Sequence, residues 1–244
     1  MVNKNETGYT ARMPNASFKQ ALFRAFPVTL PVLSGYLAIG IPFGLLLTQN
    51  GYPWFLAPLM SLLMYAGAGQ YISIGLFAAG ATLPVLAATI LLVNIRHIVY
   101  GLSLLTPFRT AGKWKPYLIF SLTDETYALL TGVNPPENLP PGSFYGAIAL
   151  LNHSYWVTGS LIGALIGELL PFTLAGLDFA LTALFIVLLI DQLRRSRDPV
   201  PAIIGGICSA GALLLLGPSR MLIAALAAAL CVLTLIRGKH AFNT

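Results

Sequence analysis

Apolar residues form eight long runs along this chain, and clusters of polar turn residues separate most of them. Most runs approach the roughly 20 residues that a helix needs to cross a bilayer, so the pattern predicts transmembrane helices. The turns between them are rich in asparagine, proline and glycine, and no linker is long enough to separate two domains. The predicted segments are residues 27–48, 53–79, 83–106, 116–132, 143–169, 174–190, 200–216 and 219–236.

The composition indicates that lipid is the main solvent. Hydrophobic residues make up 57% of the 244 residues and charged residues only 9%, whereas soluble proteins carry roughly 25% charged residues. The mean hydropathy is +0.78, and these values together exclude a soluble globular protein and a disordered chain. We predict an all-α polytopic membrane protein with seven or eight transmembrane segments. A single membrane domain over residues 17–237 lies between cytoplasmic tails at 1–16 and 238–244, and the first tail lacks a signal-peptide pattern.

Two predicted helices contain interruptions near their middles, at residues 66–70 and 152–154. Non-helical backbone inside a membrane needs protein or a water-lined cavity around it, and broken helices often hold transporter substrates. We therefore expect residues 67–71 and 152–155 to be non-helical and close together near mid-membrane. The alternative is that their small residues only permit close helix packing. The candidate site residues from this region are Gly67, Gly69, Gln70, Tyr71, Asn152, Tyr155 and Trp156.

A faint internal repeat accompanies these interruptions. At one fixed offset, Tyr71 corresponds to Tyr155 and Asn94 to Asp178. The order of a span, an interrupted span and a further span occurs twice. The pattern predicts two three-segment pseudo-repeats followed by two C-terminal helices.

Basic residues allow two membrane topologies. The N-terminal region, the arginines at 194–197 and the tail at 237–239 favour the cytoplasm under the positive-inside rule. If all eight segments cross, the two units are inverted and the basic loop 109–115 lies outside, against the rule. If segments two and five are re-entrant, every basic loop is inside and the units are parallel. Inverted repeats are common in transporters, which slightly favours the first topology.

Formal charges are rare within the apolar runs. Arg96 is the only one between Arg24 and Arg109. On a helix with about 100° per residue, one half of residues 94–105 is polar and the other half aliphatic. The polar half must face the bundle or water, because an isolated charge costs several kcal/mol in lipid. Its candidate site residues are Asn94, Arg96, His97 and Tyr100.

The segment 116–132 carries the opposite charge. On a continuous helix, Ser121, Asp124 and Glu125 share one face. Asp124, Glu125 and Asp178 are the candidate partners of Arg96, and one arginine cannot neutralise three acids. At least one acid is then protonated, exposed to water or available to a substrate ammonium group. The alternative is an ion pair that only holds helices together.

Other chemistries have no matching pattern. The histidines and acids fit no metal-ligand spacing, Ser154 beside His153 is not a nucleophile–base motif, and no glycine loop for phosphates is present. We expect no metal, no cofactor and no catalytic residue. Cys208 and Cys231 lie in apolar runs and suggest no disulfide framework. The net charge of +6 comes mostly from segments between the runs, so it indicates topology and no nucleic-acid partner.

Four stretches resemble the signatures of the AzlC/YgaZ family, in that family's order and at similar intervals. They are Pro42-Phe43-Gly44-Leu45, the run from Tyr65 to Tyr71, Asn94-x-Arg96-His97-x-x-Tyr100-Gly101 and Leu122-Thr123-Asp124-Glu125. The similarity covers about residues 20–237, and Gly69 departs from it because the family more often has serine there. The resemblance implies the large subunit of a branched-chain amino-acid exporter in the bacterial inner membrane, for valine, leucine, isoleucine and analogues. It also implies a small AzlD/YgaH-like membrane partner.

The residues themselves leave four functions open: a transporter for small zwitterions, a channel or proton-conducting pore, a membrane-embedded enzyme, and a structural subunit. A zwitterion needs an anion site and a cation site. Arg96 or the backbone amides of residues 67–70 can bind the carboxylate, and Asp124 or Glu125 can bind the ammonium. The shorter side chain of Asp124 suits a fixed ion pair, while Glu125 reaches further and suits proton exchange. Saturable, stereospecific amino-acid flux separates the first function from the others.

Overall fold

Every regular element of the computed structural model is a helix in the residues that it describes, which are 18–169, 182, 186, 189–190, 193–194 and 198–241. Helices α1 (Phe18–Gln49) and α4 (Leu83–Ser103) are long and apolar enough to cross a membrane, and α9 (Val200–Leu216) is a shorter apolar helix. The all-helical class is therefore confirmed for this part of the chain. The other elements are α2 (Leu56–Leu63), α3 (Gly67–Ala78), the 3-10 turns η1 (Pro107–Thr110) and η2 (Gly112–Trp114), α5 (Lys115–Phe120), α6 (Asp124–Gly132), α7 (Pro141–Leu169) and α10 (Pro218–Ala241).

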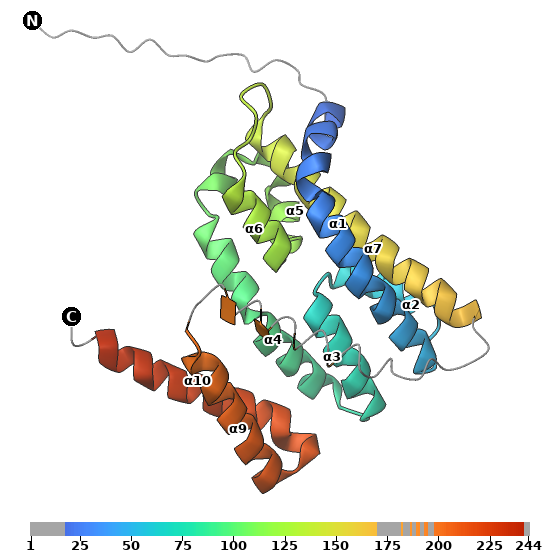
Figure 1. Ribbon diagram of the computed structural model, residues 1–244. Coiled ribbons are helices and arrows are strands. Elements are labelled where there is room, and N and C mark those ends of the chain that lie inside the picture. The colour runs from blue at the N-terminus through green and yellow to red at the C-terminus, as the bar shows by residue number, and fades with distance from the viewer. Residues whose placement is uncertain are drawn as a thin grey trace, which may run out of the picture.

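Helices α1 and α7 pack side by side and form the scaffold of the fold (Figure 1). They run in the same direction, because Gly40 lies against Gly159 and Gly44 against Gly163 further along both helices. A Cβ atom on Gly163 would overlap the carbonyl of Ile41. Small residues thus allow this close approach, as is common where helices pack in membranes.

The second predicted segment turns back on itself. Helices α2 and α3 are separated by a break at residues 64–66, where Tyr65 has a φ of 37°. Tyr52 lies before α2 beside the end of α1, and its ring centroid is 5.7 Å from that of Phe77 near the end of α3. Both ends of the segment therefore lie beside the carboxyl end of α1. We call residues 53–79 the first hairpin and residues 64–66 its tip.

The fourth predicted segment also turns back, from the opposite end of the scaffold. Helices α5 and α6 are separated by a break at residues 121–123. Trp114, before α5, stacks on Phe18 at the start of α1 with ring centroids 4.7 Å apart. Leu130, near the end of α6, shares a core cluster with Ala21 of α1. We call residues 116–132 the second hairpin and residues 121–123 its tip.

Helix α6 begins at Asp124 for a local reason. Thr123 has an extended backbone, and its Oγ1 accepts a hydrogen bond from the backbone N–H of Thr126 at 3.2 Å. This is N-capping, and the acids Asp124 and Glu125 in the first turn favour the positive end of the helix. The break in this segment is therefore encoded by the residues that follow it.

The predicted interruption at 152–155 is wrong. Helix α7 continues through these residues, because Asn152 and His153 bond through their side chains to neighbouring segments and leave the helical backbone intact. A continuous helix of 29 residues cannot enter the membrane and leave it on the same side. The predicted alternative of a re-entrant fifth segment is therefore also wrong. The predicted non-helical backbone at 67–71 is also wrong, because these residues form the first turns of α3. A break does occur just before them, at residues 64–66.

The predicted order within the pseudo-repeats is wrong in the described residues. The second interrupted segment is 116–132, not 143–169. Ser121 does not share a helix with Asp124 and Glu125, because the tip separates them. The two C-terminal helices are present as α9 and α10, which pack against each other (Figure 1). Most of the predicted segment 174–190, including Asp178, lies outside the described residues.

Candidate functional site

The tips of the two hairpins meet at a cavity beside the middle of α1. Its volume is about 540 Å³ with its open mouth included. Three long helices and both hairpins contribute to its wall. The lining residues are Tyr36 and Ile39 from α1, residues 65–68 from the first hairpin, Asn94, Arg96 and His97 from α4, residues 123–125 from the second hairpin, and Trp156 from α7.

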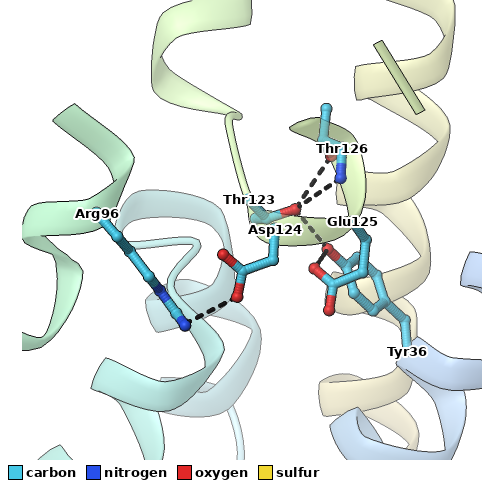
Figure 2. Close-up of polar contacts among 6 residues, drawn as sticks. All are labelled: Tyr36, Arg96, Thr123, Asp124, Glu125 and Thr126. Carbon is cyan, nitrogen blue, oxygen red and sulfur yellow. Dashed lines mark hydrogen bonds and ion pairs between the residues drawn. The ribbon is translucent and has the colours of Figure 1, made fainter. Parts of the chain in front are cut away.

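One ion pair crosses this cavity between α4 and α6. The Nη2 atom of Arg96 lies 2.9 Å from Oδ2 of Asp124, and Figure 2 shows the guanidinium pointing at that carboxylate. The Nε atom of Arg96 and Oδ1 of Asp124 have no hydrogen-bond partner among the described residues. Both atoms are buried, so the pair leaves one donor and one acceptor unsatisfied in the interior of the described part of the chain.

Glu125 has a different environment from its neighbour Asp124. Its Oε2 atom accepts a hydrogen bond from the Tyr36 hydroxyl at 2.9 Å (Figure 2). The same hydroxyl lies 2.7 Å from Oγ1 of Thr123. No basic side chain of the described residues forms an ion pair with Glu125, so its charge is balanced only by hydrogen-bonding dipoles.

Helix α7 fixes the second hairpin through its polar residues. Nδ2 of the fully buried Asn152 donates to Oγ1 of Thr126 at 3.1 Å. Oγ1 of Thr123 donates to the same Thr126 oxygen. The start of α6 is thus joined to both α7 and α1 by buried hydrogen bonds, and such networks rigidify the groups that they connect.

The first hairpin is fixed by a second chain of buried hydrogen bonds. The Trp156 indole N–H donates to Oε1 of Gln70 at 2.7 Å, and Nε2 of Gln70 donates to Oγ of Ser61 at 3.1 Å. Ser61 in turn donates to Oγ of Ser160 at 2.8 Å. These bonds join α2 and α3 to each other and to α7, so the tip between them has a defined position.

His153 of α7 connects the two hairpins directly. Its Nε2 atom lies 3.1 Å from the carbonyl oxygen of Ser61, which only accepts, so Nε2 carries the hydrogen. Its Nδ1 atom then accepts from the Tyr117 hydroxyl of α5 at 3.0 Å. The imidazole also stacks on Tyr65, with ring centroids 4.2 Å apart. Tyr65 is the residue that holds a left-handed backbone at the first tip.

Both hairpins place the amino end of a helix at the cavity, but the two ends differ in capping and in charge. The first amides of α3 border it, and α3 has neither a capping side chain nor an acid in its first turn. The start of α6 is capped by Thr123 and carries two acids. The amino end of a helix bears a partial positive charge. This charge makes the α3 side of the cavity electropositive, whereas the two acids make the α6 side electronegative.

The structure brings together half of the predicted site residues in the cavity wall. These are Gly67, Asn94, Arg96, His97, Asp124, Glu125 and Trp156. Five others lie behind the wall or at its edge, namely Gly69, Gln70, Tyr71, Asn152 and Tyr155, and each is buried. Tyr100 stacks instead on Tyr127 of α6, with ring centroids 4.4 Å apart. Asp178 lies outside the described residues.

Several lining or supporting residues were not predicted. Tyr36, Ile39, Tyr65, Thr123 and His153 belong to this group. Thr123 followed by two acids is a signature of a helix start and could have indicated the second tip. His153 lies in the predicted interruption at 152–154 and Tyr65 begins a signature stretch, whereas Tyr36 and Ile39 carry no comparable signal in their neighbourhood. Within the described residues, no group of three or more histidines, cysteines or acids is placed to hold a metal ion.

The fold and the site define a helical membrane protein with a charged cavity between two interrupted segments. The curated relatives agree with this class. An uncharacterized membrane protein of Helicobacter pylori is 42% identical over 221 residues, covering 90% of this chain and 96% of the relative. The branched-chain amino acid transport protein AzlC of Bacillus subtilis is 39% identical over 219 residues, covering 89% and 86%. The inner membrane protein YgaZ of Escherichia coli is 33% identical over 177 residues, covering 70% and 72%.

A family model described as AzlC protein matches residues 31–170. The chain belongs to the AzlC family. The resemblance in the signature stretches is thereby confirmed. No solved structure matches the chain.

Proposed function

We propose that this chain is the large subunit of a secondary transporter that exports branched-chain amino acids across the bacterial inner membrane. The name of the Bacillus subtilis relative supports amino-acid transport. The observation that carries the proposal is the cavity between the hairpin tips, which has an electropositive side at α3 and, at Glu125, a carboxylate that has no ion-pair partner among the described residues. A small zwitterion needs both.

The cavity suggests how such a substrate is oriented. The substrate carboxylate binds at the amino end of α3 and beside the partly exposed guanidinium of Arg96, and its ammonium binds at Glu125. The aliphatic side chain packs against Ile39 and Trp156, which are the apolar parts of the wall. Because Asp124 is held by Arg96, it orients the arginine and does not itself bind the ammonium.

The hairpins suggest a topology that neither sequence-based alternative contained. Segments two and four are re-entrant from opposite sides, and the other six segments cross the membrane within one domain over residues 17–237. The amino end of α1, with Lys19 and Arg24, then lies on the same side as the loop that carries Lys113. All basic regions and both termini are cytoplasmic in this arrangement, as the positive-inside rule requires.

Accessibility of single cysteines tests this topology. In a background with Cys208→Ser and Cys231→Ser, we expect Lys113→Cys and Asn138→Cys to react with an impermeant maleimide only from the cytoplasmic side. Thr82→Cys should react only from the opposite side. Crossing by all eight segments predicts the reverse for Lys113 and Thr82, so that labelling pattern would refute the re-entrant hairpins.

The family resemblance supports a small AzlD/YgaH-like membrane subunit as the partner. The test of the proposed function is counterflow of labelled valine, leucine and isoleucine in proteoliposomes, with and without that subunit. We expect saturable, stereospecific exchange of L-enantiomers that requires the subunit. Exchange by the large chain alone would refute the need for a partner. Flux that does not saturate indicates a pore, and a chemically altered amino acid indicates an enzyme.

A further inference from the structure

Glu125 stands out among the charged groups of the cavity. The groups that face it are Tyr36 of α1, Tyr65 of the first tip, and Arg96 and His97 of α4, besides its own neighbour Asp124. The charge of Arg96 is neutralised by Asp124 at 2.9 Å. His97 also lines that side of the cavity, beside Arg96 on α4. Glu125 therefore has no cation of its own among the described residues.

Two tyrosine hydroxyls lie near the Glu125 carboxylate, and only one of them bonds to it. The Tyr36 hydroxyl occupies Oε2 of the carboxylate. The Tyr65 side chain is only 3% exposed, and its hydroxyl has no hydrogen-bond partner in the described part of the chain. Tyr65 also packs edge-on against Tyr36, with ring centroids 6.5 Å apart. A buried hydroxyl without a partner costs free energy unless a ligand or water satisfies it.

We propose that Glu125 binds the substrate ammonium and a proton alternately, so that one proton enters for each amino acid exported. This inference rests on the proposed function and adds the energy source to it. On one side of the membrane the carboxyl O–H bond breaks, the proton passes to water, and the ammonium takes its place by a hydrogen-bonded ion pair. On the other side the amino acid leaves, and a proton from water forms the O–H bond again.

The need to pair the Glu125 carboxylate makes the exchange obligatory. Arg96 and Asp124 together are neutral, so an empty cavity with ionised Glu125 carries one net negative charge. An unpaired charge is costly in a membrane interior. A bound zwitterion leaves the net charge unchanged, but its ammonium pairs with Glu125 while its own carboxylate lies at the amino end of α3, so no charge is left unpaired. The carrier therefore changes its orientation only when Glu125 holds a proton or an ammonium group. One carboxylate cannot hold both, which couples the two flows in opposite directions.

The test uses the chain reconstituted with its small subunit, with labelled leucine as the probe. In wild-type vesicles, an imposed pH gradient should drive leucine uphill, toward the more acidic side. Glu125→Gln should lose this accumulation and the pH dependence of exchange, while leucine exchange without a gradient continues with a KM raised about tenfold by the loss of one charged contact. The matched control is Glu168→Gln, an exposed acid at the end of α7, which should behave as wild type.

A second variant keeps the carboxylate and changes only its hydrogen bond. Tyr36→Phe removes a donor that stabilises ionised Glu125, so the midpoint of the pH dependence should move to higher pH while coupling persists. Uphill accumulation by Glu125→Gln would overturn the proposal, as would an unmoved midpoint in Tyr36→Phe. Leucine driven by a sodium gradient and not by a pH gradient would overturn it as well. If wild type shows no leucine flux, the proposed function itself fails.

Discussion

Replacing Arg96 by leucine is expected to abolish transport and to lower the amount of folded protein. The substitution removes the partner of Asp124, which then lies in the interior with its charge unpaired. An unpaired acid near the bilayer centre costs about 2.5–3.5 kcal/mol on insertion scales. It also removes the guanidinium that we place beside the substrate carboxylate. Leucine counterflow and the yield of monodisperse protein in detergent measure the two effects.

The double variant Arg96→Leu with Asp124→Leu separates these effects. It removes both charges at once, so the folded yield should recover while transport stays absent. Arg109→Leu serves as the control, because Arg109 is an exposed residue of the loop before α5. Wild-type yield together with wild-type export in the Arg96→Leu variant would end the claim that this ion pair is needed.

His153→Leu is expected to reduce transport at least tenfold and to lower the thermal stability of the protein. The change leaves the Ser61 carbonyl and the Tyr117 hydroxyl without their partner and removes the ring that stacks on Tyr65. Each buried polar group left unpaired costs about 1–3 kcal/mol. Both hairpins then lose a contact that sets the position of their tips.

A neighbouring residue offers a close control for this variant. Ser154 is exposed, and its hydroxyl bonds only to the Leu151 carbonyl of its own helix. Ser154→Ala should therefore match wild type in thermal unfolding in detergent and in leucine counterflow. If His153→Leu also matches wild type in both measurements, the histidine does not hold the hairpins.

The sequence predicted the charged wall of the cavity well. Arg96 was the only charge over a long apolar stretch, so it needed an acid as its partner. The structure shows that this partner is Asp124. The amphipathic pattern of α4 was also correct. Ile98 and Leu102 on its apolar half are 55% and 61% exposed, while Arg96 and His97 line the cavity.

The path of the chain was predicted less well, for a physical reason. The length of an apolar segment indicates that it lies in the membrane. It does not indicate whether the segment crosses the membrane or turns back to the side from which it entered. The segment 116–132 is long enough to cross, yet Thr123 and the acids after it restart the helix in a new direction. Asn152 and His153 were interpreted as a break because polar residues disfavour lipid. Their side chains instead stabilise the breaks in the two hairpins.

The scaffold of α1 and α7 also constrains the order in which the protein assembles during synthesis. Ser61 and Gln70 of the first hairpin bond to each other, and their remaining side-chain bonds go to Ser160 and Trp156 of α7, far along the chain. A nascent chain that ends after α4 carries the first hairpin without its bonds to α7. We therefore expect the first hairpin to reach its final position only after α7 has been translated.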